Sequence, residues 1–444
     1  DAAIRKRFGA LREQVLASGA AGWRDDPYRL LAAVIVLDQF SRNLFRGEAE
    51  AFAADPLARE LTELAIARGW DAALSKEERV FLYMPLMHAE DAAGQARSVA
   101  MFEALGIEEN ARFALDFLER DLRMAGHMGC VNDQAHVIKG DNSLKINLTG
   151  ITSGDGSPLD FSVPIQGYDA AGTDPGDELT IGGTWSGAAD LPASITSLSP
   201  SPIGGSDILV LRYLAPEGSP VLTITADPDG SIATIASDAA ARLLAGTATT
   251  PSLFAVADCS RVDVFSGSLV NSTLTAEDTD LTGYAANNAV TMVYRAEAVV
   301  YYVARNTANE PSLFRARAQS NGTYANGEEL VEGVESLQFL YGLDAEANIS
   351  STAPPTGNIN VQRTAAGVST GTDAAAVGQW RRVGMVQVGL LMRSPMPASA
   401  EQASEDQVQL GVLGVGFSPA ETNDRRYRAS YEVSVALRNR LFGN

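Results

Sequence analysis

Lysine is almost absent from the larger, later part of this 444-residue chain. After residue 126 only Lys139 and Lys145 occur, and residues 127–444 hold 18 basic against 34 acidic side chains, a net charge of −16. Residues 1–126 hold 16 against 21, a net charge of −5. Because phosphate backbones and anionic lipids are bound by clustered Lys and Arg, this pattern argues against nucleic acid as a partner. It favours a secreted or periplasmic surface module.

Long apolar runs are missing as well. No uninterrupted apolar stretch reaches the roughly 18 residues that are needed to span a bilayer. No signal peptide is present, and the chain begins at Asp1 instead of Met. We therefore expect processed, truncated or engineered material.

Cysteine is scarce, with Cys130 and Cys259 as the whole complement. Two cysteines cannot build a Cys-rich metal site, and we predict no metal and no cofactor. A disulfide between them would close a loop of roughly 130 residues, which stabilises a fold by about 4–5 kcal/mol in the chain-entropy model. We predict this disulfide, and with it an oxidising compartment. The alternative is a pair of buried free thiols.

The first hundred residues are rich in Ala and Arg and follow helical periodicity. Apolar residues recur at helical spacing through Tyr28–Phe45. Asp55-Pro56 is typical of a helix start and Gly69 of a helix end. Ser75–Glu78 has the pattern of a capping box. The segment predicts an array of short antiparallel helices, similar in style to a helical repeat.

Four strings in this part resemble an uncharacterised bacterial family of small TPR-like helical proteins: Leu37–Gly47, Ala51–Asp55, Phe81–Asp91 and Gln95–Gly106. The resemblance covers residues 1–107, and its most specific string reads LDQFSRNLFRG. Ser41 and Ala89 stand where the family usually has Pro and Ser. The family's usual opening helix and its closing segment are missing, so this part resembles a trimmed copy.

A polar cluster in the helical part offers an enzymatic alternative. Its members are Asp38, Gln39, Arg42, Asn43, Arg46, His88, Glu90 and Asp91. His88 beside Glu90 and Asp91 would serve as an acid–base or metal-binding group. The competing interpretation is a set of hydrogen bonds and ion pairs that hold the helices together. We favour the second, and predict a stabilising or carrier role and no catalytic residues.

Residues 108–126 predict one amphipathic helix that ends at Gly126. Leu115, Leu118 and Leu122 lie on one stripe of this helix, which predicts packing against a sheet. Phe113 and Phe117 lie on an adjoining stripe and are candidate contacts for a partner.

The sequence from Asn110 to Cys130 resembles the lower part of the N-terminal helix of PilW-type minor pilins of type IV pili. The resemblance extends over residues 110–444 and includes Val334–Asp344, Trp380–Ser394 and Tyr431–Arg440. It lacks the prepilin cleavage site and the transmembrane half-helix, whose place is taken by the helical part. The simplest account is an engineered fusion in which the two helices are spliced into one, and the alternative is a natural fusion.

The sequence of the remainder of the chain predicts β-structure. Strands are predicted at Ile208–Leu214, Val221–Thr225, Val290–Val303, Val334–Tyr341, Val383–Met392 and Tyr431–Leu437, with a short helix at Ala239–Ala245. Residues 350–378 and 396–407 have few bulky side chains and are interpreted as loops. Asp344, Glu346 and Asn348 have the spacing of calcium ligands but lack the rest of an EF-hand, so we favour a turn.

These observations predict an α+β multidomain chain. An all-α antiparallel helical array (1–107) is joined by a continuous helix (108–126) to a pilin-like antiparallel β head (127–444), whose N-terminal helix packs on the sheet and which holds up to two β subregions. The resemblance implies a structural component of the pilus tip that acts in assembly, adhesion and twitching motility. It implies other minor pilins and the tip adhesin as partners, with the membrane reached only through the missing helix.

The same resemblance implies a location in the periplasm or inner membrane before assembly and in the extracellular pilus afterwards. The alternatives are activity in the helical part, or a ligand-binding adhesin module marked by an exposed aromatic groove.

Overall fold

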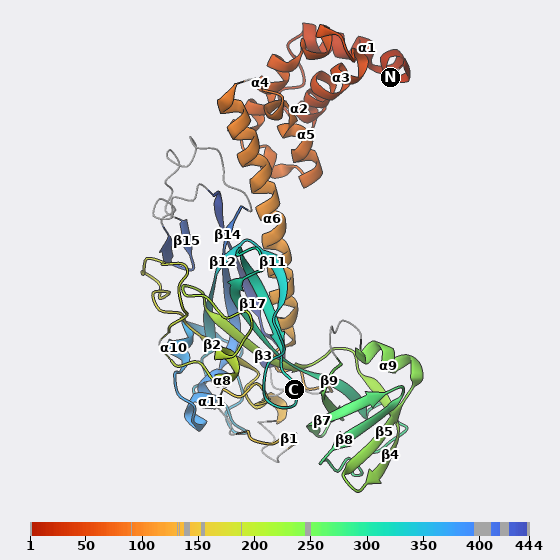
Figure 1. Cartoon of the computed structure of the whole chain (residues 1–444), viewed down its shortest axis with the longest axis vertical. Helices are drawn as coiled ribbons and strands as arrows, with labels where there is room; N and C mark the ends of the chain where they lie inside the picture. Colours follow the sequence, from red (N-terminus) through yellow and green to blue (C-terminus); the bar gives the residue numbers. More distant parts are fainter. Residues whose placement is uncertain are drawn as a thin grey trace. The chain divides into compact units, whose positions relative to one another are not determined.

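The computed structural model describes residues 2–89, 91–130, 132, 134–136, 143–151, 156–187, 189–244, 250–394, 410–417 and 426–441 (Figure 1). The chain divides into two compact units. The helical unit comprises Asp1–Glu109, Ser394–Val408 and Pro419–Arg428, and the β-rich unit comprises Asn110–Arg393, Gln409–Ser418 and Ala429–Asn444. Helix α6 (Ala92–Met124) contributes residues to both. The predicted α+β multidomain class is confirmed.

The helical unit is built from short helices. They are α1 (Ala2–Ala17), α2 (Pro27–Ile35), α3 (Ser41–Leu44), α4 (Asp55–Ala67), α5 (Lys76–Met87) and the 3-10 turns η2 (Ala49–Phe52) and η3 (Asp71–Ala73). The predicted capping box is confirmed, because Glu78 N donates to Ser75 Oγ (3.3 Å) and Ser75 N to Glu78 Oε2 (2.8 Å). Leu30, Leu61 and Leu82 are fully buried in the core that these helices share.

The segment Tyr28–Phe45 differs from the single helix that its periodicity predicts. Helix α2 ends at Ile35, a π-helical turn, η1 (Val36–Phe40), follows, and α3 then runs to Leu44. A π turn inserts one residue into the helical ladder and rotates the side chains that follow, which a 3.6-residue period does not reveal. In this turn Asp38 is directed inward and is buried.

The β-rich unit contains three sheets within the described residues. The largest joins β1 (Leu144–Asn147), β2 (Ile165–Tyr168), β3 (Ile208–Leu214), β4 (Ser219–Asp227), β5 (Gly230–Ile235), β6 (Leu253–Ala257), β7 (Val262–Val270), β8 (Thr273–Glu277), β9 (Met292–Arg305), β10 (Pro311–Arg317) and β11 (Glu328–Glu332). The second has the order β13 (Ile359–Arg363), β12 (Val334–Asp344), β14 (Val383–Arg393) and β17 (Arg428–Ala436). The third pairs β15 (Leu410–Val412) with β16 (Val415–Phe417).

Short helices complete this unit: α8 (Ala193–Thr196), α9 (Ser237–Leu244), α10 (Ala365–Val368), α11 (Ala374–Arg381) and α12 (Arg438–Leu441). All six predicted strands are present, with ends that shift by a few residues. Alternate residues of β14 lie on one face of the strand, and these residues, Val386, Val388, Leu390 and Met392, are all fully buried.

The prediction of a loop over 350–378 is wrong. This stretch holds β13, which pairs with β12, and the two helices α10 and α11. Each helix has its own N-cap, with Thr364 Oγ1 accepting from Gly367 N (3.4 Å) and Asp373 Oδ1 from Ala376 N (2.9 Å). These caps stabilise helices that have few bulky residues to bury. The predicted loop 396–407 lies outside the described residues.

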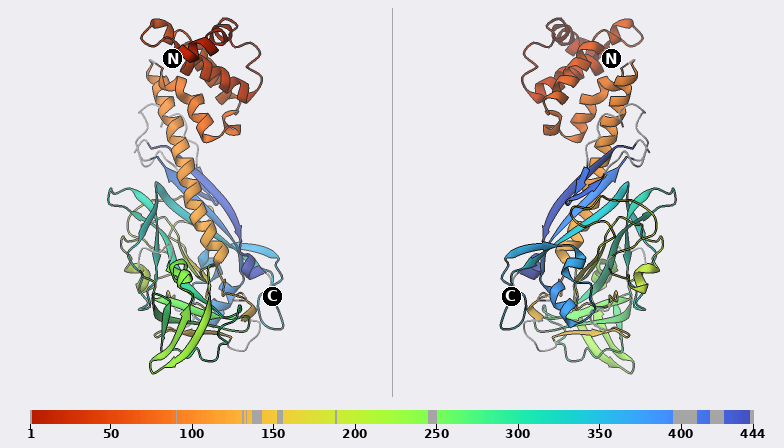
Figure 2. Two further views of the ribbon diagram at one scale, coloured as in Figure 1. Left: turned by 90° about the vertical axis from the view of Figure 1, so that its right-hand side faces the viewer. Right: turned by 90° about the vertical axis from the view of Figure 1, so that its left-hand side faces the viewer.

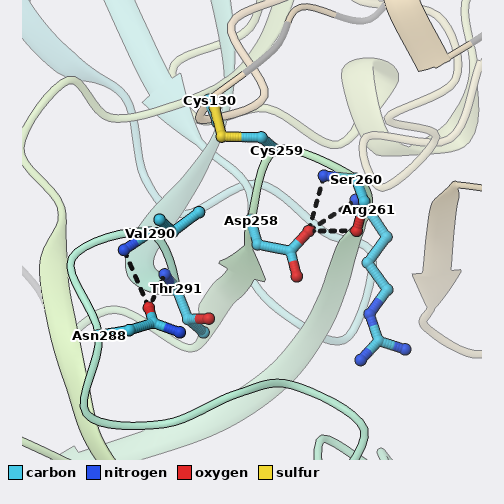
Figure 3. Close-up of a disulfide and its surroundings, with 8 residues drawn as sticks. All are labelled: Cys130, Asp258, Cys259, Ser260, Arg261, Asn288, Val290 and Thr291. Atoms are coloured by element: carbon cyan, nitrogen blue, oxygen red, sulfur yellow. Dashed lines mark hydrogen bonds between the residues drawn. A yellow bond between two sulfur atoms is a disulfide. The ribbon is translucent and has the colours of Figure 1, made fainter.

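A disulfide joins Cys130, which follows α6, to Cys259, in the turn between β6 and β7 (Figure 3). The Cα atoms are 4.8 Å apart and the cysteines are 129 residues apart in sequence. Asp258 stabilises the turn that contains Cys259, since its Oδ1 accepts from Ser260 N (2.7 Å), Ser260 Oγ (2.6 Å) and Arg261 N (3.0 Å). Burial alone would raise the pKa of Asp258, but these hydrogen bonds lower it below the ordinary value.

We expect the variant Cys259→Ser to lose about 4–5 kcal/mol of unfolding free energy in the β-rich unit, since the covalent closure of a long loop is lost. Hydrogen exchange read by mass spectrometry will report this as faster exchange in β6 and β7. The amides of α2 and α4, in the helical unit, serve as the internal control. Unchanged exchange in β6 and β7 would contradict a stabilising role for the disulfide.

Candidate functional site

The C-terminal half of α6 lies on the β-rich unit, along the strands of its sheets (Figure 2). Hydrogen bonds tie it there from Asn110 Nδ2 to the Glu332 carbonyl (3.3 Å) and from Asn439 Nδ2 to the Arg123 carbonyl (2.9 Å). The helix is therefore attached near both ends of this half, to β11 and to α12.

The buried stripe of this half-helix differs slightly from the predicted one. Leu118 and Leu122 are fully buried, whereas Leu115 is only half-buried. Ala111, Ala114 and Ala125 complete the buried stripe. Small side chains at these positions allow the helix backbone to approach the sheet closely. That Leu115, Leu118 and Leu122 form the packing surface stays a prediction.

A buried polar contact lies on the same stripe. Asp121 is 5% exposed and accepts from the Tyr301 hydroxyl (2.6 Å) on β9 and from Arg315 Nη1 (3.3 Å) on β10. Tyr301 and Arg315 are cross-strand neighbours in the register of β9 and β10. Burial, reinforced by the negative charge of Asp121, raises the pKa of Tyr301 well above its ordinary value and keeps the phenol a neutral donor.

Further charges alternate across β9, β10 and β11. Glu328 Oε2 lies 3.2 Å from both Arg315 Nη2 and Arg317 Nη1, and Glu297 Oε2 lies 3.4 Å from Arg317 Nε. Arg295 pairs with the other oxygen of Glu297. Since the carboxylates and guanidinium groups alternate, each buried charge has a partner of opposite sign.

The two candidate contact residues differ in exposure. Phe113 is 45% exposed, and the Arg112 guanidinium carbon lies 5.7 Å from its ring centroid. Phe117 is half-buried, and the corresponding distance from Arg315 is 5.8 Å. Of the two, Phe113 is the aromatic side chain that this half-helix presents to solvent. Aromatic residues beside Arg are frequent anchors of protein interfaces.

The calcium-like spacing at Asp344 belongs to a turn. Asp344 Oδ1 accepts from Glu346 N (2.8 Å), Thr356 N (3.1 Å) and Thr356 Oγ1 (2.8 Å), and its Oδ2 accepts from Gly357 N (2.7 Å). Burial acts to raise the pKa of Asp344, but these donors lower it overall. Within the described ranges, no group of three His, Cys, Asp or Glu is placed to hold a metal ion.

The polar cluster of the helical unit is divided between two places. His88 Nδ1 lies 2.7 Å from Asp38 Oδ1, and Arg42 Nη2 donates to Asp55 Oδ2 (2.9 Å). Asp91 pairs instead with Arg59. The suggested grouping of His88 with Asp91 is therefore wrong, and Glu90 lies outside the described residues. Gln39 donates to Asp38, Asn43 Nδ2 to the Gln39 carbonyl (3.0 Å), and Arg46 to Asn43 Oδ1 (3.2 Å).

A cavity of about 290 Å³ is lined by Arg295, Glu297, Arg317, Leu253 and otherwise small or polar side chains and proline, without an aromatic residue. Another, of about 130 Å³, has Tyr168 in its lining, and this side chain is 6% exposed. An adhesin site in an exposed aromatic groove stays a prediction.

Sequence reasoning missed Asp121, Tyr301 and Arg315. A signal existed for Asp121, because it lies three residues after Leu118 and so falls within the apolar stripe of the helix. Arg315 interrupts an otherwise buried strand, but its partner could not be found without the register of β9 and β10.

The chain thus combines an all-α unit with a unit in which a helix lies on antiparallel strands, as expected of a pilin-like head. Residues 300–439 match the family model described as Type IV Pilus-assembly protein W. Residues 1–138 match the model described as Bacterial protein of unknown function (DUF924). The predicted two-part resemblance is confirmed. The second of these matches extends beyond residue 107, through the rest of α6 and past its end at Met124.

The match to Type IV Pilus-assembly protein W supports a general role related to pilus assembly and a pilus-associated location, in the envelope or outside the cell. Among the helices of the described residues, none is both long and apolar enough to cross a membrane.

A solved structure of a protein of unknown function from Agrobacterium tumefaciens is 44% identical, over 21% of this chain and 53% of its own, with a TM-score of 0.21. The present chain thus spans about half the length of that protein. No curated protein matches the chain.

We expect Asp121→Ala to lower the unfolding free energy of the β-rich unit by about 3 kcal/mol, because Arg315 and Tyr301 lose a buried partner. Denaturant unfolding followed by near-UV circular dichroism will measure the loss. Asp121→Asn, which keeps an acceptor for Tyr301, should lose less. Asp116→Ala, an exposed position on the same helix, should change stability by less than about 0.5 kcal/mol. Equal stability of the Asp121→Ala and Asp116→Ala variants would refute the importance of this contact.

Proposed function

We propose that the β-rich unit is the head of a minor pilin, a structural component of the type IV pilus that acts in the tip or initiation complex. Its function is association: the half-helix of α6 packs with the helices of other pilins, and the β-rich head contacts its neighbours. Adhesion and twitching motility would then depend on this unit through the pilus that it helps to assemble.

The match of residues 300–439 to Type IV Pilus-assembly protein W carries this proposal. The disulfide supports it, because such bonds persist in the periplasm and outside the cell. The acidic surface, nearly free of lysine, suits the same compartments. We therefore propose the periplasm or inner membrane before assembly and the extracellular pilus afterwards, with other minor pilins and the tip adhesin as partners.

The N-terminal segment of the helical unit precedes this head in the chain. We propose a boundary near residue 107, with residues 108–126 as a shared helix. We propose that this unit stabilises or carries the head in pilus assembly. That the two parts were joined by engineering stays a prediction.

The contact face is proposed on α6, where Phe113 is exposed on the part of the helix that belongs to the β-rich unit. Phe117 supports it from the adjacent turn, where its ring is held beside Arg315. An exposed aromatic anchor backed by a half-buried one is typical of a small interface centre.

The test is binding of the full chain to each of the other minor pilins and the tip adhesin of the same pilus, measured by biolayer interferometry. We expect at least one partner to bind, and Phe113→Ser to weaken that binding about tenfold, the effect of losing about 1.4 kcal/mol at an interface anchor.

Val270→Ser provides the matched control, because Val270 is 65% exposed and lies at the end of β7 in the same unit. Its binding should equal that of the unmodified chain. The proposal fails if no minor pilin or adhesin binds. The proposed face fails if Phe113→Ser and Val270→Ser weaken binding equally.

A further inference from the structure

Strand β4 has a free backbone edge over most of its length. One side of the strand pairs with β5 in a hairpin (Figure 1). The other side pairs with β9 through Ser219 and Pro220 alone, and Val221 N donates to the Thr291 carbonyl (3.1 Å). Beyond that point, over 222–227, no strand of the described ranges pairs with this side of β4. Since every second residue of an antiparallel strand directs its N–H and C=O groups away from its neighbour, this edge presents backbone groups without a strand partner.

Natural sheets usually prevent such an edge from pairing with another chain, by means of charged side chains, Pro or bulges. In the two larger sheets, charged residues occur in each strand that ends the strand order: Lys145 in β1, Glu328, Glu329 and Glu332 in β11, Arg363 in β13, and Glu432 in β17. The free edge of β4 has the sequence LTITA over 222–226, without a charge or Pro. Its bulge lies at the beginning, between Val221 and Thr223. The edge is therefore suited to a strand partner.

The side chains along this edge are only partly covered. Ile224 packs against the apolar core that the sheet shares with α9, yet it is only half-buried. Leu222 is 42% exposed. Thr223 and Thr225, which alternate with Ile224, are exposed on the opposite face of the strand. A further strand alongside β4 would cover apolar surface of Ile224 and Leu222, which favours association.

We propose that this edge pairs with the same edge of a second copy of the chain, antiparallel and centred on Ile224. The segment 223–225 has the same sequence in both directions, Thr-Ile-Thr. Ile224 then lies opposite Ile224 of the second copy, and Thr223 lies opposite Thr225. Cross-strand pairs of Thr and of other β-branched residues stabilise antiparallel sheets. This self-complementary order favours a second copy over an unrelated strand.

The resulting pair is closed. Both copies use the same edge, as in other two-fold dimers, so no free edge of β4 is left for a third copy. The order β8-β5-β4 of one copy continues into β4-β5-β8 of the other.

Charge repulsion is weak at this edge, although the chain carries a net charge of −21. The acidic residue of β4 is Asp227, three residues from Ile224. In the antiparallel pair the two Asp227 side chains lie six residues apart, about 20 Å at the rise of a strand. This separation exceeds the screening length of roughly 8 Å at physiological ionic strength.

The test is sedimentation velocity of the full chain over a range of concentrations. We expect a dimer that dissociates on dilution. Combining Thr223→Lys with Thr225→Lys places like charges opposite one another across the pair, and should weaken dimerisation about tenfold. The matched control combines Thr273→Lys with Thr275→Lys on β8, which is paired with β5 on one side and β7 on the other. This control should dimerise as the unmodified chain does.

A charge exchange excludes misfolding as the cause of any loss. Thr223→Glu combined with Thr225→Glu should also weaken dimerisation about tenfold. An equal mixture of the Lys and Glu variants should regain the dimer, because opposite charges then face one another. In the unmodified chain, hydrogen exchange of the amides over 222–226 should be slower at high than at low concentration.

A chain that stays monomeric at every concentration would overturn the proposal. Equal weakening by the Lys variant and the β8 control would also overturn it, as would a charge-exchange mixture that remains monomeric or a dimer whose formation leaves exchange in β4 unchanged. None of these results bears on the binding of other minor pilins, so this proposal and the proposed function can fail independently.

Discussion

The buried contact of Asp121 with Tyr301 and Arg315 fixes how the half-helix of α6 lies on the β-rich unit. A stripe of Ala and Leu is attracted to any apolar surface, and that attraction has no direction. Hydrogen bonds of 2.6 and 3.3 Å to two neighbouring strands can form in only one rotation and one position of the helix. The location of the chain after Met124, and so of Cys130, follows from that choice.

The shortage of lysine fits the use of arginine inside the β-rich unit, where some guanidinium groups are buried. Arg212 is fully buried and donates to the carbonyls of Pro158 (2.9 Å), Val163 (2.6 Å) and Ser157 (2.7 Å). A planar guanidinium can serve several acceptors at once, whereas an ammonium group is a compact charge that needs water. A buried position with several carbonyl acceptors, such as that of Arg212, therefore suits arginine and not lysine.

Patterns confined to one element were readable from the sequence, and patterns that need two elements were not. The strand Ile208–Leu214 and the Ser75 capping box were predictable because a few adjacent residues determine them. The pairing of His88 with Asp38 depends on a π turn fifty residues away, and neighbours in sequence suggested Asp91 instead. For the same reason Phe113 could be proposed from helical spacing, but Arg315 needed the strand register.

The disulfide has a mechanical consequence. A pull applied along α6 reaches Cys130 a few residues after the helix ends, and the covalent bond passes it directly to Cys259 in the turn between β6 and β7. The force therefore bypasses the chain segment between the two cysteines, which are 129 residues apart in sequence. Strands β1 to β6 lie in this segment, so they are shielded from tension along the backbone. The load is instead carried by the strands that follow the second cysteine.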